Sequence, residues 1–160
     1  MRRTLHVEPL SAASFGAFGS VIDTASAREI YPINDGTSLR FNALATVDCA
    51  SLEGVPIVSI FRAEPRARPL KIQQLERHPL GSQAFMPLGT APYLIVVSES
   101  LSALPRAFLA SCSQGINLFR GTWHHALLAL EARSDFLVID RIGAGDNCDE
   151  GELSNPVWID

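Results

Sequence analysis

After its first twenty residues the chain shows almost no helical periodicity, and this absence most constrains its fold. Short apolar runs with strand character instead follow one another, separated by turns that contain Gly or Pro. The predicted strands cover residues 41–47, 56–62, 70–75, 93–98, 106–111, 123–130 and 136–140. Many short strands without intervening helices indicate a β-sandwich or β-barrel, with a jelly roll as one candidate, and exclude a parallel βαβ fold.

One segment near the start is the best helix candidate. Residues 10–19 contain Ser11 as a capping residue, Phe15 and Phe18 on one apolar face, and Gly19 as an end signal. The 160 residues fit one domain, and no repeat, low-complexity tract or linker divides them. The sequence therefore predicts a single domain over residues 1–160, mainly β with one or two short helices.

Composition limits the partners of this domain. A net charge of -4 argues against nucleic acid, which requires a basic surface. No apolar run approaches the ~20 residues of a membrane span, and Glu8 and Pro9 interrupt any signal-like segment. The three cysteines are far apart and form no CxxC pair, so neither a disulfide framework nor a zinc site is predicted. These features predict a cytoplasmic protein.

The basic residues are almost all arginines, with Lys71 as the one lysine. The guanidinium fork suits carboxylates, so this bias favours an acidic substrate. Coding bias would produce the same composition, and the two explanations stay open.

The first cluster of chemically capable residues spans 76–83. In a strand, Glu76 and His78 point to one face and Arg77 to the other. Gln83 follows a turn containing Pro79 and Gly81 and could return to the face of His78. A carboxylate, an imidazole and an amide together suggest a metal or acid–base site. The alternative is a strand end with a solvated Glu–Arg pair and a histidine that caps a turn.

The second cluster, residues 121–125, contains His124 and His125. Adjacent strand residues face opposite sides, so only one of the two histidines should enter a given cavity. Histidine is the commonest metal ligand and the usual proton carrier near neutral pH. A packed strand surface beside Trp123 is the alternative.

Taken together, the two clusters resemble the paired metal-binding motifs of the cupin superfamily. The pattern is Glu76-x-His78-x4-Gln83, followed some forty residues later by Gly121-x-x-His124. It departs from the usual motifs because Glu76 stands at the first histidine position and Gln83 at the glutamate position. The resemblance implies a cupin-like β-barrel or jelly roll.

Longer segments resemble the bacterial ureidoglycolate lyases. The resemblance rests mainly on residues 75–88, 115–125 and 135–149, and it extends to the start of the chain and to residues 33–36. It implies a carbon–nitrogen lyase that eliminates urea from (S)-ureidoglycolate to give glyoxylate, in purine degradation through allantoin. It also implies a homodimer and a divalent metal, with nickel favoured.

Such an elimination needs a base, an acid and a cationic group for the substrate carboxylate. The resemblance suggests His78 or His124 as the base, Glu76 to orient it, and His125 as the acid or a neighbouring hydrogen-bond partner. A metal would be held by Glu76, His78, Gln83 and His124. The candidates for the carboxylate are Arg120, Arg62, Arg40 and Arg141.

Other interpretations of the same residues remain. Asp140 and Arg141 could form a structural ion pair, and Cys148 is expected to be inert because the reaction needs no covalent intermediate. The rival functions are another cupin-type enzyme, such as an isomerase or dioxygenase, and a module that binds a small acid.

Overall fold

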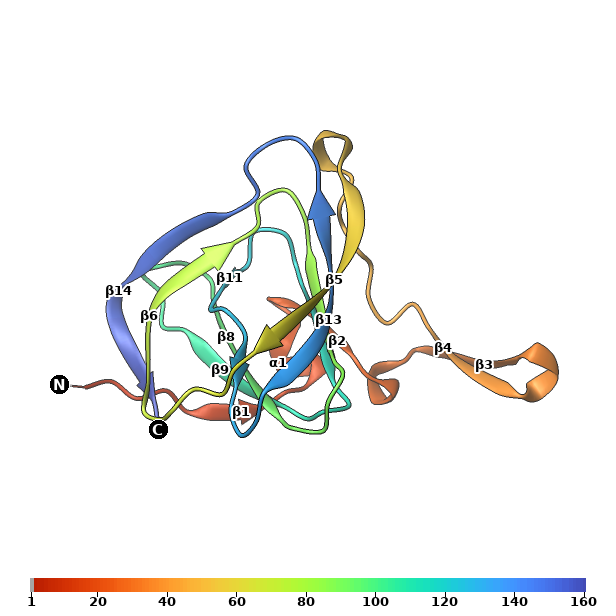
Figure 1. The fold of residues 1–160 in the computed structure, drawn as a ribbon, viewed down its shortest axis with the longest axis horizontal. Coiled ribbons are helices and arrows are strands. Elements are labelled where there is room, and N and C mark those ends of the chain that lie inside the picture. The colour runs from red at the N-terminus through yellow and green to blue at the C-terminus, as the bar shows by residue number, and fades with distance from the viewer. Residues whose placement is uncertain (1) are drawn as a thin grey trace.

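The computed structural model describes residues 2–160 and confirms the mainly β fold class (Figure 1). Two curled sheets form the body, and a separate hairpin projects from it. The first sheet has seven strands in the order β1-β9-β8-β11-β6-β14, with β12 beside β8. The second has five strands in the order β2-β10-β7-β13-β5. This half-barrel is consistent with a cupin-like fold.

The seven-stranded sheet consists of β1 Val7–Pro9, β6 Leu70–Arg77, β8 Tyr93–Ser98, β9 Arg106–Ala110, β11 Trp123–His124, β12 Leu128–Ala129 and β14 Asp149–Ile159. The five-stranded sheet consists of β2 Gly19–Ile22, β5 Val55–Ala63, β7 Gln83–Pro87, β10 Gly115–Leu118 and β13 Ser134–Ile142. The projecting hairpin consists of β3 Glu29–Ile33 and β4 Ser38–Asn42. The helical segments are α1 Ala12–Phe15 and the 3-10 turns η1 Thr24–Ser26, η2 Asn34–Gly36 and η3 Ser51–Glu53.

The predicted helix exists but is shorter than expected. Ser11 caps it as predicted, by accepting a hydrogen bond from the Ser14 amide, yet α1 ends at Phe15, with Gly16 rather than Gly19 as its C-cap. Gly19 instead begins β2, which pairs with β10. A Cβ at Gly19 would lie 2.3 Å from the carbonyl oxygen of Asn117, so this glycine permits the close approach of two strands.

Several strands differ from the prediction, and β1, β2, β3, β7, β10 and β14 were not predicted. The strand expected at 41–47 ends at Asn42, because Ala43 takes a left-handed backbone with φ 51 that leaves the ladder. The strand expected at 123–130 is split into β11 and β12. The eleven-residue β14 was not predicted, since Pro156 reads as a strand breaker. It is tolerated because β14 is an edge strand whose register shifts between Glu152 and Val157.

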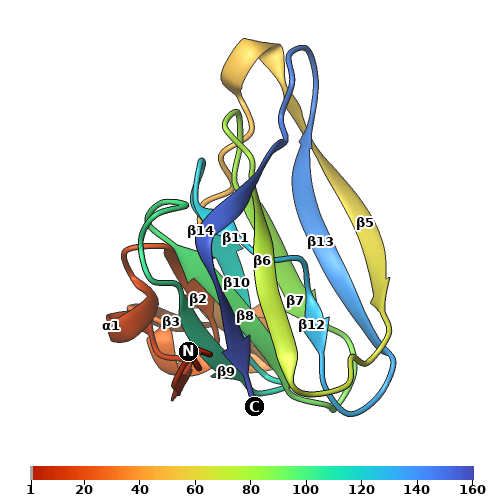
Figure 2. The same cartoon turned by 90° about the vertical axis from the view of Figure 1, so that its left-hand side faces the viewer.

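The core between the sheets is rich in aromatic side chains. Tyr93 and Phe136 meet edge to face across it with ring centroids 5.0 Å apart, and Phe15 of α1 meets Phe108 in the same way at 5.4 Å. A second apolar cluster is formed by buried side chains of β6, β8 and β14 with their neighbours. Figure 2 shows the arrangement of these strands. No helix among residues 2–160 is long and apolar enough to span a membrane.

Truncating one core ring should test this packing. We expect Phe136→Ala to lower the free energy of unfolding by about 3–5 kcal/mol, because the fully buried ring leaves a cavity. Urea denaturation measures the change. Phe119→Ala is the matched control, since Phe119 is 45% exposed and its truncation should cost no more than ~0.5 kcal/mol. Equal losses in the two variants would contradict this description of the core.

Candidate active site

Three side chains of the two sequence clusters meet at one end of the barrel. Glu76 near the end of β6 and His124 of β11 are direct cross-strand partners, so their side chains share a face. His78 follows β6, and its ring centroid lies 5.2 Å from that of His124. The ligand atoms of Glu76, His78 and His124 all lie within 4.8 Å of one another. The alternation predicted from sequence is observed, because Arg77 points away and pairs with Asp149.

Backbone carbonyls fix the orientation of both imidazoles. Nδ1 of His78 lies 2.7 Å from the carbonyl oxygen of Asn147, and Nδ1 of His124 lies 2.9 Å from that of Thr122. A carbonyl can only accept, so each Nδ1 carries the proton. Nε2 of His124 therefore faces Oε1 of Glu76 at 3.4 Å, while Nε2 of His78 lies 3.2 Å from Oε1 of Gln83. Metal-ligating histidines are held in this way by a hydrogen bond from their other ring nitrogen.

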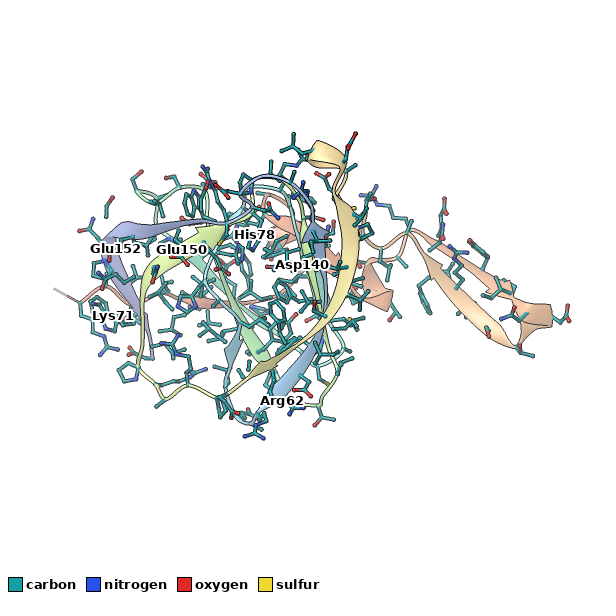
Figure 3. All side chains as sticks on the ribbon, turned by 45° about the horizontal axis from the view of Figure 1, so that its top comes forward. Arg62, Lys71, His78, Asp140, Glu150 and Glu152 are labelled. Atoms are coloured by element: carbon teal, nitrogen blue, oxygen red, sulfur yellow. The ribbon has the colours of Figure 1, made fainter. Side chains whose placement is uncertain are left out.

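Gln83 and Asp140 extend the cluster toward the second sheet. The amide nitrogen of Gln83 donates to Oδ2 of Asp140 at 3.3 Å, which directs the Gln83 carbonyl oxygen to within 3.2 Å of Nε2 of His78. That contact joins two acceptors when His78 is neutral. Figure 3 shows His78 and Asp140 at the same end of the body.

The unsatisfied atoms of this cluster fit a bound cation. Nε2 of His124 is buried without a hydrogen bond among the described residues, 3.4 Å from Oε1 of Glu76, and Oδ1 of Asp140 is also without a partner there. A lone pair facing a carboxylate is favourable only with a proton or a metal ion between them. Two imidazoles and one carboxylate suit a divalent transition metal, so the donor set fits such an ion.

The local electrostatics keep Glu76 ionised. The contact with His124 lowers the pKa of the Glu76 carboxyl, more than its partial burial raises it. Burial lowers the pKa of His125, and the positive charge of Arg66 adds to this effect. The pKa of the Cys148 thiol is raised by burial and by the nearby carboxylates, Glu76 first. A protonated thiol agrees with the expectation that Cys148 is no nucleophile.

Two adjoining cavities border the cluster and share Glu76, His125 and Ala126. The inner one measures about 80 Å³ and is mostly apolar, with Phe61 and Gln83 in its wall. The outer one measures about 290 Å³ and is lined by polar side chains, among them Arg66. Their combined size suits a small polar metabolite.

Comparison with known proteins identifies the family. The model of the family described as ureidoglycolate lyase matches residues 2–160. The chain belongs to the ureidoglycolate lyase family. It is 53% identical over 152 residues to the ureidoglycolate lyase of Pseudomonas fluorescens, which covers 92% of this chain and 90% of the relative. It is 49% identical over 160 residues to that of Burkholderia mallei, covering 98% and 94%.

Within this member of the family, the four arginines proposed from sequence lie outside the two cavities. Arg120 forms a two-pronged ion pair with Asp48, at 2.9 and 2.6 Å. Arg62 pairs in the same way with Asp135, at the opposite end of the body from His78 (Figure 3). The structure therefore gives each of these guanidinium groups a carboxylate of its own.

The other two arginines serve the backbone and the hairpin. Arg40 lies on β4 with its guanidinium 5.9 Å from the Tyr31 ring. Arg141 is buried and donates to the carbonyl oxygens of Ser51 and Ala144. The structural ion pair suggested for Asp140 and Arg141 is absent from residues 2–160, because neighbours on a strand face opposite sides.

Sequence reasoning missed three residues that the structure brings to the site. Arg66 lines the outer cavity beside Glu76 and His125, Asp140 orients Gln83, and the Asn147 carbonyl holds His78. Arg66 stands in the Arg-rich loop between β5 and β6, where only composition distinguishes it from its neighbours.

Proposed function

We propose that this chain is a carbon–nitrogen lyase that eliminates urea from (S)-ureidoglycolate and releases glyoxylate, a step of purine degradation. Membership of the ureidoglycolate lyase family supports the substrate. The observation that carries the chemistry is the convergence of the His78 and His124 imidazoles with the ionised Glu76 carboxylate beside a small cavity. The three free cysteines suit a reducing compartment, so we place the enzyme in the cytoplasm.

We further propose that Glu76, His78 and His124 hold a divalent metal ion, with Gln83 adjoining, and that the ion is nickel. Imidazole ligands suit nickel, and the family resemblance favours it. When bound, the ion would acidify the carbinol hydroxyl and offset charge on the substrate. Asn147 and Thr122 keep the two imidazoles in the tautomer that this role requires.

The proton is carried by a residue outside the ligand set. His125 lines both cavities, and its ring is turned by a hydrogen bond to the Ala126 carbonyl at 2.9 Å. We assign it to take the hydroxyl proton and return it to the departing urea nitrogen. The hydroxyl oxygen then forms the glyoxylate carbonyl as the carbon–nitrogen bond breaks, so no net proton is consumed. Such a transfer accounts for roughly 10²–10⁴-fold in rate.

The remaining requirement is a cation for the substrate carboxylate. Arg66 reaches the outer cavity, and its guanidinium has no ion-pair partner among residues 2–160. Arg120, Arg62, Arg40 and Arg141 are engaged elsewhere, so we assign the carboxylate to Arg66 in preference to them.

Product analysis tests the proposal. Purified protein is incubated with racemic ureidoglycolate before chelation, after chelation and after chelation with added nickel. We expect urea and glyoxylate in equal amounts without ammonia, loss of turnover on chelation, and recovery with nickel. Turnover that survives complete removal of metal would contradict the metal assignment. Failure to release urea under every metal condition would contradict the lyase and favour another cupin-type activity.

A further inference from the structure

The outer cavity is lined by one carboxylate that the proposed reaction leaves without a role. Glu150 of β14 borders this cavity together with Arg66, Glu76 and His125. Arg66 is assigned to the substrate carboxylate, Glu76 to the metal ion and His125 to the proton. A carboxylate can only accept hydrogen bonds, so Glu150 suits a part of the substrate that carries N–H or O–H groups.

Strand register places Glu150 in line with the metal-ligand cluster. Glu76 of β6 pairs directly with His124 of β11 on one side and with Glu150 of β14 on the other. Cross-strand partners share a face of the sheet, so the three side chains form a row on one face. A carboxylate oxygen of Glu150 lies within 4.8 Å of one of Glu76. Figure 3 shows Glu150 at the end of the body that carries His78.

One oxygen of the Glu150 carboxylate is engaged, and the other is open. The side-chain amide of Gln74 donates to Oε2 of Glu150 at 3.2 Å, which holds the carboxylate beside the cavity that both residues line. Oε1 accepts no hydrogen bond from residues 2–160, and no ion pair within that range includes Glu150 or Arg66. The cavity therefore presents one open cation and one open anion that do not neutralise each other.

This pair of charges matches the two ends of ureidoglycolate, which carries a carboxylate at one end and a ureido group at the other. In a ureido group, the inner N–H and one N–H of the terminal amide can point in the same direction. Such a parallel pair of donors fits the two oxygens of a carboxylate, as the fork of a guanidinium does. With the substrate carboxylate on Arg66, the ureido group needs an acceptor. Glu150 is the carboxylate of this cavity that is not already a proposed metal ligand.

We propose that Glu150 binds the ureido end of the substrate by accepting its N–H groups, and that Arg66 and Glu150 together select a small acid that carries a urea group. This inference rests on the proposed lyase function and names the residue that sets its specificity. A 2-hydroxy acid of similar size without N–H groups would leave the Glu150 carboxylate desolvated and unpaired. Sites built to hydrogen-bond a substrate group reject analogues that lack the group for this reason.

Inhibition by the two products separates the two ends of the substrate. Glu150→Gln replaces one acceptor oxygen with an N–H donor. We expect it to raise KM for ureidoglycolate and the inhibition constant of urea by about 10–100-fold, the range for loss of hydrogen bonds to a charged group. The inhibition constant of glyoxylate, which has no N–H group, should not rise. Arg66→Gln should give the reverse pattern, with weaker inhibition by glyoxylate and unchanged inhibition by urea.

Glu152→Gln is the matched control. Glu152 lies two residues further along β14, is exposed like Glu150, accepts a hydrogen bond from Gln73 and lines neither cavity. Its substitution should leave KM and both inhibition constants unchanged. Metal content should equal that of the wild type in both variants, and circular dichroism should show that both are folded.

The possible failures point to different causes. Wild-type KM and urea inhibition in Glu150→Gln would overturn this inference alone. Equal weakening of inhibition by urea and by glyoxylate would also overturn it, because a loss without selectivity indicates a structural role. Loss of metal from Glu150→Gln would instead make Glu150 a metal ligand. A wild-type protein that releases no urea under any metal condition would contradict the proposed function itself, and the inference with it.

Discussion

Replacing His124 with Gln is expected to lower kcat/KM for ureidoglycolate by about 10³-fold and to abolish stoichiometric metal binding. The imidazole is 3% exposed, its Nδ1 is held by the Thr122 carbonyl, and its Nε2 faces Glu76 at 3.4 Å. Gln cannot keep both contacts, so the proposed metal site loses a ligand. A metal ion that acidifies and orients substrate contributes several kcal/mol to the rate, and each 1.36 kcal/mol is tenfold.

Metal content by mass spectrometry and initial rates of urea release measure the two effects independently. His6→Gln is the matched control, because His6 is exposed at the N-terminus and should leave both quantities unchanged. His78→Gln provides a second test at a less buried position, in case the His124 variant unfolds. Variants that fold and retain both metal and wild-type rates would overturn the assignment of this cluster as the catalytic centre.

The convergence of Glu76, His78 and Gln83 was predictable because it depends on local rules. Alternation along β6 and into the residue that follows it places Glu76 and His78 together, and the turn after His78 returns Gln83 to the same side. The mainly β fold class was predictable for a similar reason, because short apolar runs alternate with turns along the sequence. Where a predicted strand boundary was wrong, the cause was a backbone conformation or strand pairing that depends on the tertiary structure. Ala43 leaves the ladder with a positive φ, and Pro156 is accommodated by a register shift at an edge.

The ion-pair partners of the arginines could not be predicted from the sequence. Arg120 is satisfied by Asp48, 72 positions away, and Arg62 by Asp135, 73 positions away. No periodicity indicates such distant partners. The place of Arg66 could not be predicted for the same reason. Its proposed role depends on how one loop lies beside the outer cavity rather than on any motif. What distinguishes it is its place beside the outer cavity combined with the absence of a carboxylate partner within residues 2–160, which only the fold reveals.

Arg66 therefore carries the second large prediction. We expect Arg66→Gln to raise KM for ureidoglycolate and to lower kcat/KM by about 10–100-fold, because a hydrogen bond to a charged group contributes about 1.5–3 kcal/mol. The substitution removes the charge but keeps a side chain of similar length. Metal content should not change, since Arg66 is not among the ligands. Steady-state kinetics over a range of substrate concentrations separates KM from kcat.

Arg133→Gln is the control that matches this change in charge. Arg133 is also exposed and on the surface, but it pairs with Glu64 away from the two cavities, so its loss should leave KM unaltered. Arg120, which pairs with Asp48, provides the test of the alternative assignment. If Arg120→Gln raises KM and Arg66→Gln does not, the ion pair must open to admit substrate, and the carboxylate belongs to Arg120. If only Arg66→Gln raises KM, Arg66 holds the substrate carboxylate. The reason is that the site needs a cation that no carboxylate among residues 2–160 already neutralises.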